Sequence, residues 1–377
     1  MTPEQDRAFM ERAITAGRRA RYWSAPNPPV GCVLVRDDIV IGEGFTQPVG
    51  EAHAEVMALA AAREANGMNA CRGATAYVTL EPCSHQGHTG PCLSALIDAG
   101  VERVVVAVED PNPEVAGRGL SGLREAGIEV DVGTGAEEVE QDLAGFLLRM
   151  RRGYGRITLK IAAALDGRTA MASGESRWIS SEPARQDVQR LRAESDLIVT
   201  GVGTVLADDC RLTVRSDVLP LSDGDKARAL ARPPVRMVLD SRGKTPTDAR
   251  VLQGEPAILM TTSVPAYPPP TTVHQIPANT EGRIDLGQWI AWLRSQTYNE
   301  ILVEAGPTLA GALLKEGWVD RLILYQSPKL LGDTARPLAV MALHELSDAV
   351  ELAFTEVTRI GPDLRIMATP RLRGGDQ

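Results

Sequence analysis

The spacing of apolar side chains along the first 150 residues predicts alternating helices and strands. Between Glu4 and Trp23 apolar residues recur every three or four positions, which is typical of an amphipathic helix. Two aliphatic runs, 30–35 and 39–45, are joined by two aspartates as in a hairpin. We further expect helices at 55–65, 93–99 and 136–150, and strands at 74–80 and 103–108. This alternation predicts a three-layer α/β/α sandwich with its active-site loops at strand ends.

A second α/β pattern follows a short, charged and glycine-punctuated link at 151–155. We expect helices at 183–193 and 308–316, and strands at 157–163, 196–200, 235–239, 257–260, 300–304, 321–325 and 351–358. The polar or proline-rich stretches 215–234 and 263–284 are expected to be loops without chemistry. A chain of 377 residues exceeds one ordinary core, so we expect two domains, 1–150 and 151–377.

Composition narrows the class of protein. With 44% hydrophobic and 24% charged residues, the chain has the make-up of an ordinary soluble domain protein. A formal charge of −9 predicts no nucleic-acid partner, although a local pocket for one phosphate is compatible with it. We expect no membrane partner and no signal peptide, because long apolar runs and a basic start are missing. Five widely spaced cysteines fit reduced thiols, which predicts a cytoplasmic protein.

One histidine and two cysteines have the spacing of a catalytic zinc site. His53 and Glu55 lie at the start of a predicted helix, and Cys83 and Cys92 follow, each after a proline. Three protein ligands leave the fourth tetrahedral position of Zn²⁺ for water. Glu55 is placed to carry protons from that water to a ring nitrogen and to departing ammonia. The pattern is similar to the His-x-Glu and Pro-Cys-x-x-Cys signature of zinc nucleobase deaminases, with a longer spacing between the cysteines.

Other interpretations stay open. His53 could cap a helix while both cysteines are buried apolar residues. His85 or His88 could act as a further ligand and close the site. The protein could also be a scaffold without enzymatic activity, in which zinc only folds the N-terminal domain. A further alternative is a deaminase of tRNA or another nucleobase, with the C-terminal half as an RNA-binding module. The charge of −9 and the lack of a basic, aromatic-rich stretch speak against it.

The second half has no Rossmann fingerprint, but it carries features that suit phosphates. Gly306 to Ala312 opens a predicted helix, whose backbone amides could cradle a pyrophosphate, although a helix cap is the simpler interpretation. Arg192 and Arg215 suit a sugar phosphate, because a guanidinium binds phosphate as a fork. Solvated surface charge is the alternative for both arginines.

Several segments resemble the RibD family of bifunctional riboflavin biosynthesis enzymes. These segments are 27–31, 79–85, 110–113, 115–119, 160–168, 176–180, 201–213 and 304–311. The resemblance implies zinc-dependent deamination of 2,5-diamino-6-(5-phosphoribosylamino)pyrimidin-4-one. It implies, as the second reaction, NADPH-dependent reduction of the ribosyl group of 5-amino-6-(5-phosphoribosylamino)uracil to a ribityl group. It also implies a dihydrofolate-reductase-like α/β fold in the second half and assembly as a homodimer or tetramer.

The resemblance also implies roles for individual residues. Asn27 would hold the pyrimidine ring near Glu55, and Lys160 and Asp166 would stabilise charge, relay a proton or form a structural pair. Ser241 followed by Arg242 suits the extra phosphate of NADPH, which favours it over NADH. The residues around NADPH would be Ala162, Trp178, Thr204, Asp208, Ser241, Gly306, Pro307, Thr308, Leu309, Ala310, Gly311 and Ala312. Those around the phosphoribosyl substrate would be Ser176, Arg192, Leu212, Arg215 and Glu304.

Overall fold

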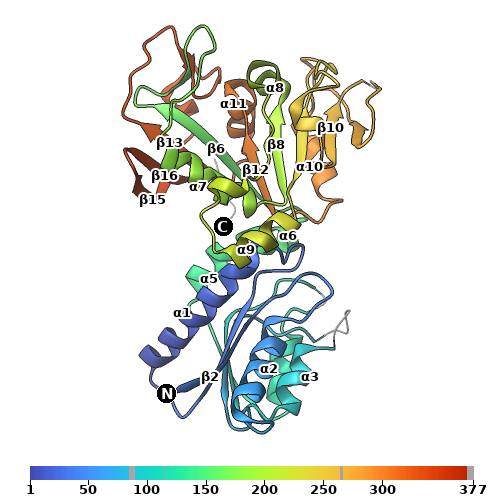
Figure 1. Ribbon diagram of the computed structural model, residues 1–377, viewed down its shortest axis with the longest axis vertical. Helices are drawn as coiled ribbons and strands as arrows, with labels where there is room; N and C mark the ends of the chain where they lie inside the picture. The colour runs from blue at the N-terminus through green and yellow to red at the C-terminus, as the bar shows by residue number, and fades with distance from the viewer. Residues whose placement is uncertain (85–89, 114, 264–265, 372–377) are drawn as a thin grey trace. The chain divides into compact units, whose positions relative to one another are not determined.

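The computed structural model describes residues 1–84, 90–113, 115–263 and 266–371 (Figure 1). The chain divides into two compact units, Met1–Gly155 and Arg156–Gln377, and both are built from helices packed on a sheet. The α/β fold class predicted for each half is confirmed. Within the described residues, no helix is long and apolar enough to cross a membrane.

The first unit contains a five-stranded sheet in the order β2-β1-β3-β4-β5. The predicted hairpin forms β1 and β2, and its turn residues Asp37 and Asp38 both have positive φ. Strands β3, β4 and β5 run parallel. The strands are β1 (Gly31–Arg36), β2 (Ile39–Phe45), β3 (Thr75–Leu80), β4 (Arg103–Val108) and β5 (Glu129–Val132). The helices are α1 (Pro3–Arg19), α2 (Ala54–Asn66), α3 (Cys92–Asp98), α4 (Arg118–Glu125), α5 (Ala136–Asp142) and α6 (Ala144–Arg152), with a 3-10 turn at Ala20–Tyr22.

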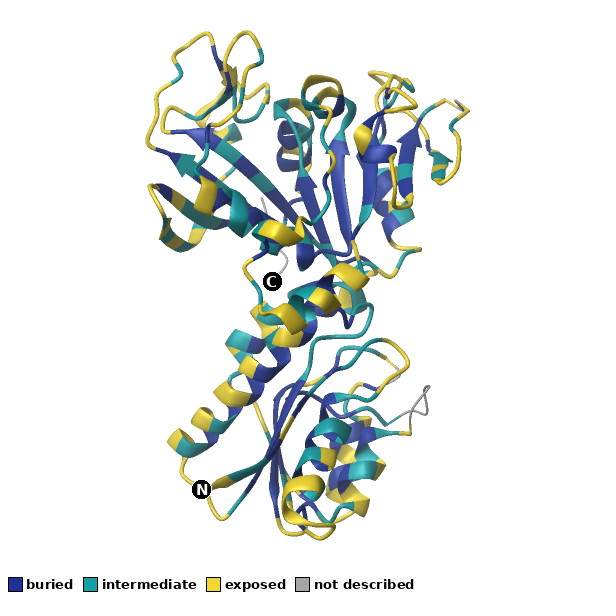
Figure 2. Cartoon of the chain, in the orientation of Figure 1, coloured by how far each residue is buried: buried dark blue, intermediate teal, exposed yellow. Residues whose placement is uncertain are grey.

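Alternation along the strands divides the core of this unit into two layers of side chains. On β1, Leu34 packs in a cluster with residues of α2, α3 and α4, whereas Val35 packs in a cluster with residues of α1, α5 and α6. Both faces of the sheet are therefore covered, and its central strands are buried (Figure 2). The predicted three-layer sandwich is confirmed. The helix expected at 136–150 is instead two helices that meet at Leu143, a bend that keeps Val139 and Leu147 in the same buried cluster.

The second unit contains a nine-stranded sheet in the order β11-β10-β9-β8-β12-β6-β13-β16-β15. It is parallel from β11 to β13, and the last two strands are antiparallel. The strands are β6 (Arg156–Ala164), β8 (Leu197–Gly201), β9 (Val235–Leu239), β10 (Ala257–Thr261), β11 (Thr271–Gln275), β12 (Glu300–Glu304), β13 (Arg321–Ser327), β15 (Leu352–Ile360) and β16 (Asp363–Pro370), beside a small pair of β7 (Arg168–Ala170) and β14 (Arg336–Pro337). The helices are α7 (Glu182–Ala193), α8 (Val202–Asp208), α9 (Asp223–Ala231), α10 (Leu286–Leu293) and α11 (Pro307–Lys315), with 3-10 turns at Ser216–Val218, Arg250–Leu252 and Leu346–Asp348.

Two stretches expected to be loops contain regular elements. Helix α9 lies within 215–234, where the Ser222 side chain caps it by accepting the backbone N–H of Asp225. Strand β11 lies within 263–284 and pairs with β10 at the edge of the sheet. An edge strand is only half covered, so β11 lacks the apolar run by which a buried strand is recognised. The prediction of loops is wrong in both places, and for β11 this half coverage is the reason.

Candidate functional site

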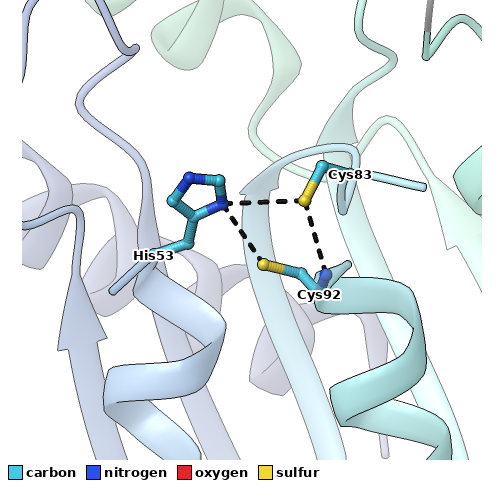
Figure 3. A group of neighbouring side chains, drawn as sticks. All are labelled: His53, Cys83 and Cys92. Atoms are coloured by element: carbon cyan, nitrogen blue, oxygen red, sulfur yellow. Dashed lines mark hydrogen bonds between the residues drawn. The ribbon is translucent and has the colours of Figure 1, made fainter. Parts of the chain in front are cut away.

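The three predicted zinc ligands meet beside the carboxyl end of β3 (Figure 3). His53 Nδ1 lies 3.6 Å from Cys83 Sγ and 3.4 Å from Cys92 Sγ. The backbone N–H of Cys92 also donates to Cys83 Sγ over 3.4 Å. One imidazole nitrogen and two sulfurs therefore face a common point.

This spacing fits a zinc ion. Zinc binds sulfur at about 2.3 Å and nitrogen at about 2.0–2.1 Å, so tetrahedral geometry places the two kinds of ligand about 3.6 Å apart. The observed nitrogen–sulfur distances of 3.4 and 3.6 Å agree with that value. Across the described residues, the group holds these three side chains and no fourth ligand. Three ligands of this kind, if no further one joins them, would leave one tetrahedral position of Zn²⁺ for water.

Local structure brings each ligand to this point. His53 is the N-cap residue of α2, whose inner face is buried against the sheet. Cys83 follows the end of β3 by three residues. Cys92 is the first residue of α3, directly after Pro91, and proline suits the start of a helix because no N–H is needed there. Buried elements thus hold the segments that carry all three ligands.

Glu55 lies in the first turn of α2 and is 4% exposed. Burial, together with the negative charge of Cys83, raises the pKa of Glu55 to about 7. A hydrogen bond with Cys92 lowers the pKa of Cys83, against the opposing effect of burial. Glu55 follows His53 by two residues at the start of α2, which suits a proton carrier for chemistry at the metal.

Other residues predicted for this site have different outcomes. Asn27 lies in the turn before β1, where its backbone N–H donates to the Ser24 carbonyl over 2.9 Å. The contact of its side chain with a pyrimidine ring stays a prediction. His85 and His88 lie outside the described residues, so a further ligand from that loop also stays a prediction.

The second unit contains a cavity of about 1660 Å³ at the carboxyl ends of its parallel strands, where open α/β sheets bind ligands. Gly201, Leu239 and Glu304, the last residues of β8, β9 and β12, all line it. Its described wall has twelve basic and six acidic residues, although the whole chain carries a formal charge of −9. This local excess of positive charge suits a ligand with several phosphates.

The residues predicted for the cofactor and the phosphoribosyl substrate line this cavity, with one exception. Ala310 is fully buried and shares the inner face of α11 with Leu313 and Leu314. Its side chain belongs to the core, because helix residues three and four apart share one face. The residues that do line the cavity are Ala162, Ser176, Trp178, Arg192, Thr204, Asp208, Leu212, Arg215, Ser241, Glu304, Gly306, Pro307, Thr308, Leu309, Gly311 and Ala312.

Arg192 and Glu304 form a two-bond fork in the cavity wall. Arg192 Nε lies 2.6 Å from Glu304 Oε1, and its Nη2 lies 3.1 Å from Oε2. The remaining Nη1 donates to the Thr213 carbonyl over 3.1 Å. Burial alone would raise the pKa of Glu304, but Arg192 and Lys160 outweigh it and lower that pKa to about 2. The geometry thus makes Arg192 a partner of Glu304 and leaves it few donors for a phosphate.

Arg215 offers the contrasting case. Its backbone N–H donates to Gln189 Oε1 over 3.0 Å, and its side chain is exposed at the cavity. An exposed guanidinium can meet a phosphate without first breaking a fork. Leu212, three residues earlier, is 3% exposed with a φ of 56°, a strained backbone conformation of the kind that clusters at ligand sites.

Lys160 and Asp166 do not form the structural pair that was one of their predicted roles. Lys160 Nζ lies 3.6 Å from Glu304 Oε2. Asp166 instead accepts the backbone N–H groups of Leu331 and Gly332 at 2.8 and 2.9 Å. Lys160 therefore belongs to the cavity, whereas Asp166 holds a turn.

The wall after β9 gathers basic residues around Ser241. Ser241 Oγ accepts the backbone N–H of Ile284 over 2.9 Å, which fastens the preceding segment beside it. Arg242, Lys244 and Arg283 all line the cavity and are exposed. Arg283 lies in the stretch expected to carry no chemistry, where no motif in the sequence marks it as a cavity residue. Its pair with Glu281, at 3.6 Å and largely exposed, holds it only weakly.

The predicted pyrophosphate cradle lies at the start of α11. Gly306 is the N-cap residue, and its backbone N–H donates to Thr204 Oγ1 over 3.1 Å. A side chain at Gly311 would meet the Val340 carbonyl oxygen at 2.1 Å from its Cβ, so this face of the helix accepts only glycine. The start of α11 is thereby fixed between α8 and the Val340 segment.

Two family models match the chain. The cytidine and deoxycytidylate deaminase zinc-binding region matches residues 3–108, and the RibD C-terminal domain matches residues 156–366. The second half is therefore a reductase domain, and the alternative of an RNA-binding module is not supported. The scaffold alternative is likewise not supported, because both matched domains are enzymatic kinds.

Full-length relatives agree with the two models. The riboflavin biosynthesis protein RibD of Escherichia coli (strain K12) is 49% identical over 368 residues, covering 96% of this chain and 98% of the relative. A solved structure of Acinetobacter baumannii RibD is 40% identical with a TM-score of 0.86, covering 98% of this chain and 100% of that one. A Thermotoga maritima deaminase/reductase structure is 31% identical with a TM-score of 0.87, covering 98% and 99%. The chain belongs to the RibD family of bifunctional riboflavin biosynthesis enzymes.

Proposed function

We propose that residues 1–150 deaminate 2,5-diamino-6-(5-phosphoribosylamino)pyrimidin-4-one and that residues 151–377 reduce the product. In the second step the ribosyl group of 5-amino-6-(5-phosphoribosylamino)uracil becomes a ribityl chain. The Thermotoga maritima relative is described as the deaminase and reductase of these compounds. The observation that carries the proposal is the zinc-fitting group of His53, Cys83 and Cys92 beside buried Glu55.

In the first reaction, the chain supplies the metal ligands, the proton carrier and the ring contact. When bound, Zn²⁺ supplies a Lewis acid that lowers the pKa of a water molecule. His53 Nδ1 and the two cysteine sulfurs would hold it. The Glu55 carboxyl would accept the proton of the attacking water and deliver protons to the ring nitrogen and the departing ammonia. Asn27 would orient the pyrimidine from the turn before β1.

In the second reaction, the cavity at the strand ends would hold NADPH and substrate together. When bound, NADPH supplies a hydride. The start of α11, from Gly306 to Ala312, would hold its pyrophosphate through backbone amides. Ser241 with Arg242, Lys244 and Arg283 would hold its 2′-phosphate. Ala162, Trp178, Thr204 and Asp208 would line the rest of the cofactor site.

The substrate would lie against Ser176, Leu212 and Arg215, with Arg215 on its phosphate. Glu304 would orient two cations at once, because Arg192 and Lys160 both approach its carboxylate. Lys160 Nζ would then stabilise the negative charge that develops on the sugar carbonyl oxygen as it is reduced.

Two further parts of the proposal concern assembly and location. We place the enzyme in the cytoplasm, supported by five cysteines of which none forms a disulfide. We also propose a homodimer or tetramer, supported by the edge strand β15, on which Phe354 is 71% and Val357 57% exposed. Size-exclusion chromatography with light scattering would test the assembly. The mass of a monomer would exclude a dimer or tetramer.

A paired assay tests the function. Purified, zinc-loaded protein receives the diaminopyrimidine ribotide, and ammonia release is followed without NADPH. NADPH is then added and its oxidation recorded. We expect ammonia first and cofactor consumption second. Ammonia alone would contradict the reductase assignment, and no ammonia would contradict the deaminase assignment.

A further inference from the structure

We propose that Glu81 is a positioning residue of the deaminase site, which holds the 115–120 segment against the zinc-binding segment and so sets the substrate site. The inference rests on the proposed deamination reaction. Glu81 is two residues from the ligand Cys83, and its carboxylate accepts backbone N–H groups of the loop before α4 and of the first turn of α4. It would act on substrate through that loop.

The carboxylate of Glu81 is buried, with 4% exposure, and both of its oxygens are engaged. Oε1 accepts the N–H groups of Gly119 and Leu120 at 2.8 and 3.2 Å. Oε2 accepts those of Gly117 and Asp110 at 3.0 and 3.2 Å. In the described part of the chain, its partners are thus backbone groups, four donors on one side chain.

Burial of a carboxylate costs free energy unless hydrogen bonds satisfy its oxygens. The four N–H donors must therefore stay in place around Glu81. A second observation shows how tight this contact is. A Cβ on Gly119 would lie 2.2 Å from the carbonyl oxygen of Pro82, the residue before Cys83. The two backbones therefore touch directly, and a side chain at position 119 would push them apart.

Topology places this contact at the deaminase site. Strands β3 and β4 are parallel neighbours, with Leu80 beside Val108, so the chain leaves both strands at the same edge. Cys83 follows β3, and Asp110 follows β4 by two residues. Ligands of open α/β sheets bind in the crevice outside such strand ends. Because Gly119 touches Pro82, the residue before Cys83, the 115–120 segment lies at this edge of the sheet and would form a wall of the substrate site.

The substitution Glu81→Gln disrupts the four hydrogen bonds to the carboxylate with little change in side-chain volume. Glutamine keeps one acceptor oxygen, but its NH₂ group faces two N–H donors, so one pair of donors loses its acceptor. We expect the KM of the deaminase reaction to rise at least about tenfold with kcat nearly unchanged, the signature of lost substrate binding. Zinc content and reductase activity of the same protein should stay at their wild-type values.

Three further variants make the test specific. Glu109→Gln removes an exposed carboxylate next to the same loop and should change nothing. Gly119→Ala pushes the segment away from Pro82 without a change of charge and should reproduce the raised KM. Glu81→Asp keeps both oxygens on a shorter stem and should restore part of the binding.

The outcomes separate the alternatives. An unchanged KM in both Glu81→Gln and Gly119→Ala would overturn the proposal. Loss of zinc in proportion to loss of activity would also overturn it, because Glu81 would then support the metal and not the wall. If Glu81→Gln does not fold, Gly119→Ala and Glu81→Asp give the same readout. Failure of wild-type protein to release ammonia would instead contradict the proposed function.

Discussion

The fork between Glu304 and Arg192 allows a stability prediction that can be worked out from the structure. The substitution Glu304→Gln keeps the size of the side chain and removes its charge. The side chains of Glu304 and Arg192 are only 10% and 14% exposed, so solvent screens the fork weakly. Lys160 would lose its carboxylate partner in the same step. The variant therefore leaves two cations in the cavity wall without a counter-charge.

Two estimates of the stability lost in Glu304→Gln agree. Burial would raise the pKa of Glu304, but its cationic neighbours lower it from 4.5 to about 2. At 1.36 kcal/mol for each pKa unit, the charged form stabilises the fold by about 3 kcal/mol at pH 7. Because the pKa is lower in the folded state, this contribution is complete above pH 4.5 and is lost as the pH falls towards 2. In other proteins, removal of one partner of a buried ion pair lowers the free energy of unfolding by about 3–5 kcal/mol.

Hydrogen exchange of individual peptides, recorded over a series of urea concentrations, would measure this loss of local stability. Peptides of β12 and its neighbours should lose about 3 kcal/mol of protection in Glu304→Gln at pH 7, and the difference from wild type should shrink below pH 4.5. Peptides of the first unit serve as an internal control. Glu351→Gln is a matched control, because its pair with Arg371 is about 70% exposed and should contribute less than about 1 kcal/mol. A loss no larger than this control at pH 7 would refute the reasoning.

Three further predictions concern catalysis. Glu55→Gln should lower deaminase turnover at least about 100-fold while zinc and reductase activity remain, and full turnover would exclude the proton shuttle. Arg215→Ala should weaken binding of the reductase substrate by about 1.5–3 kcal/mol without loss of stability, because its guanidinium is exposed; an unchanged KM would remove it from the site. Arg283→Ala should raise the KM for NADPH and leave that for NADH unchanged. Equal effects on both cofactors would place Arg283 away from the 2′-phosphate.

The sequence identified the zinc group because its chemistry depends on residue types at short, recognisable spacings. His53 and Glu55 lie within one helical turn, and two Pro-Cys pairs mark the other ligands. The buried side of α11 could have been recognised in the same way, since Ala310, Leu313 and Leu314 repeat at helical spacing. The side chain of Ala310 therefore lies in the core, and its predicted part in the cofactor site is left to its backbone.

The partners of Arg192 could not be recognised from the sequence. Its fork with Glu304 joins residues 112 positions apart, and it forms because α7 packs beside the end of β12. Arg283 presents the same difficulty. It lines the cavity, and the next residue, Ile284, donates its backbone N–H to Ser241 Oγ, a residue far away in the sequence. A charged residue in a loop has no periodicity, so the pattern of the chain cannot tell a ligand contact from solvated charge.

By itself, the sequence determined the alternation of strands and helices, the two α/β cores and the identity of the zinc ligands. These features depend on burial periodicity and on local chemistry, both of which are written along the chain. The tertiary structure decided that Arg192 pairs with Glu304, which basic residues line the cavity after β9, and that Glu81 accepts backbone N–H groups of α4. Those features depend on contacts between distant segments, and such contacts exist only once the sheets have formed.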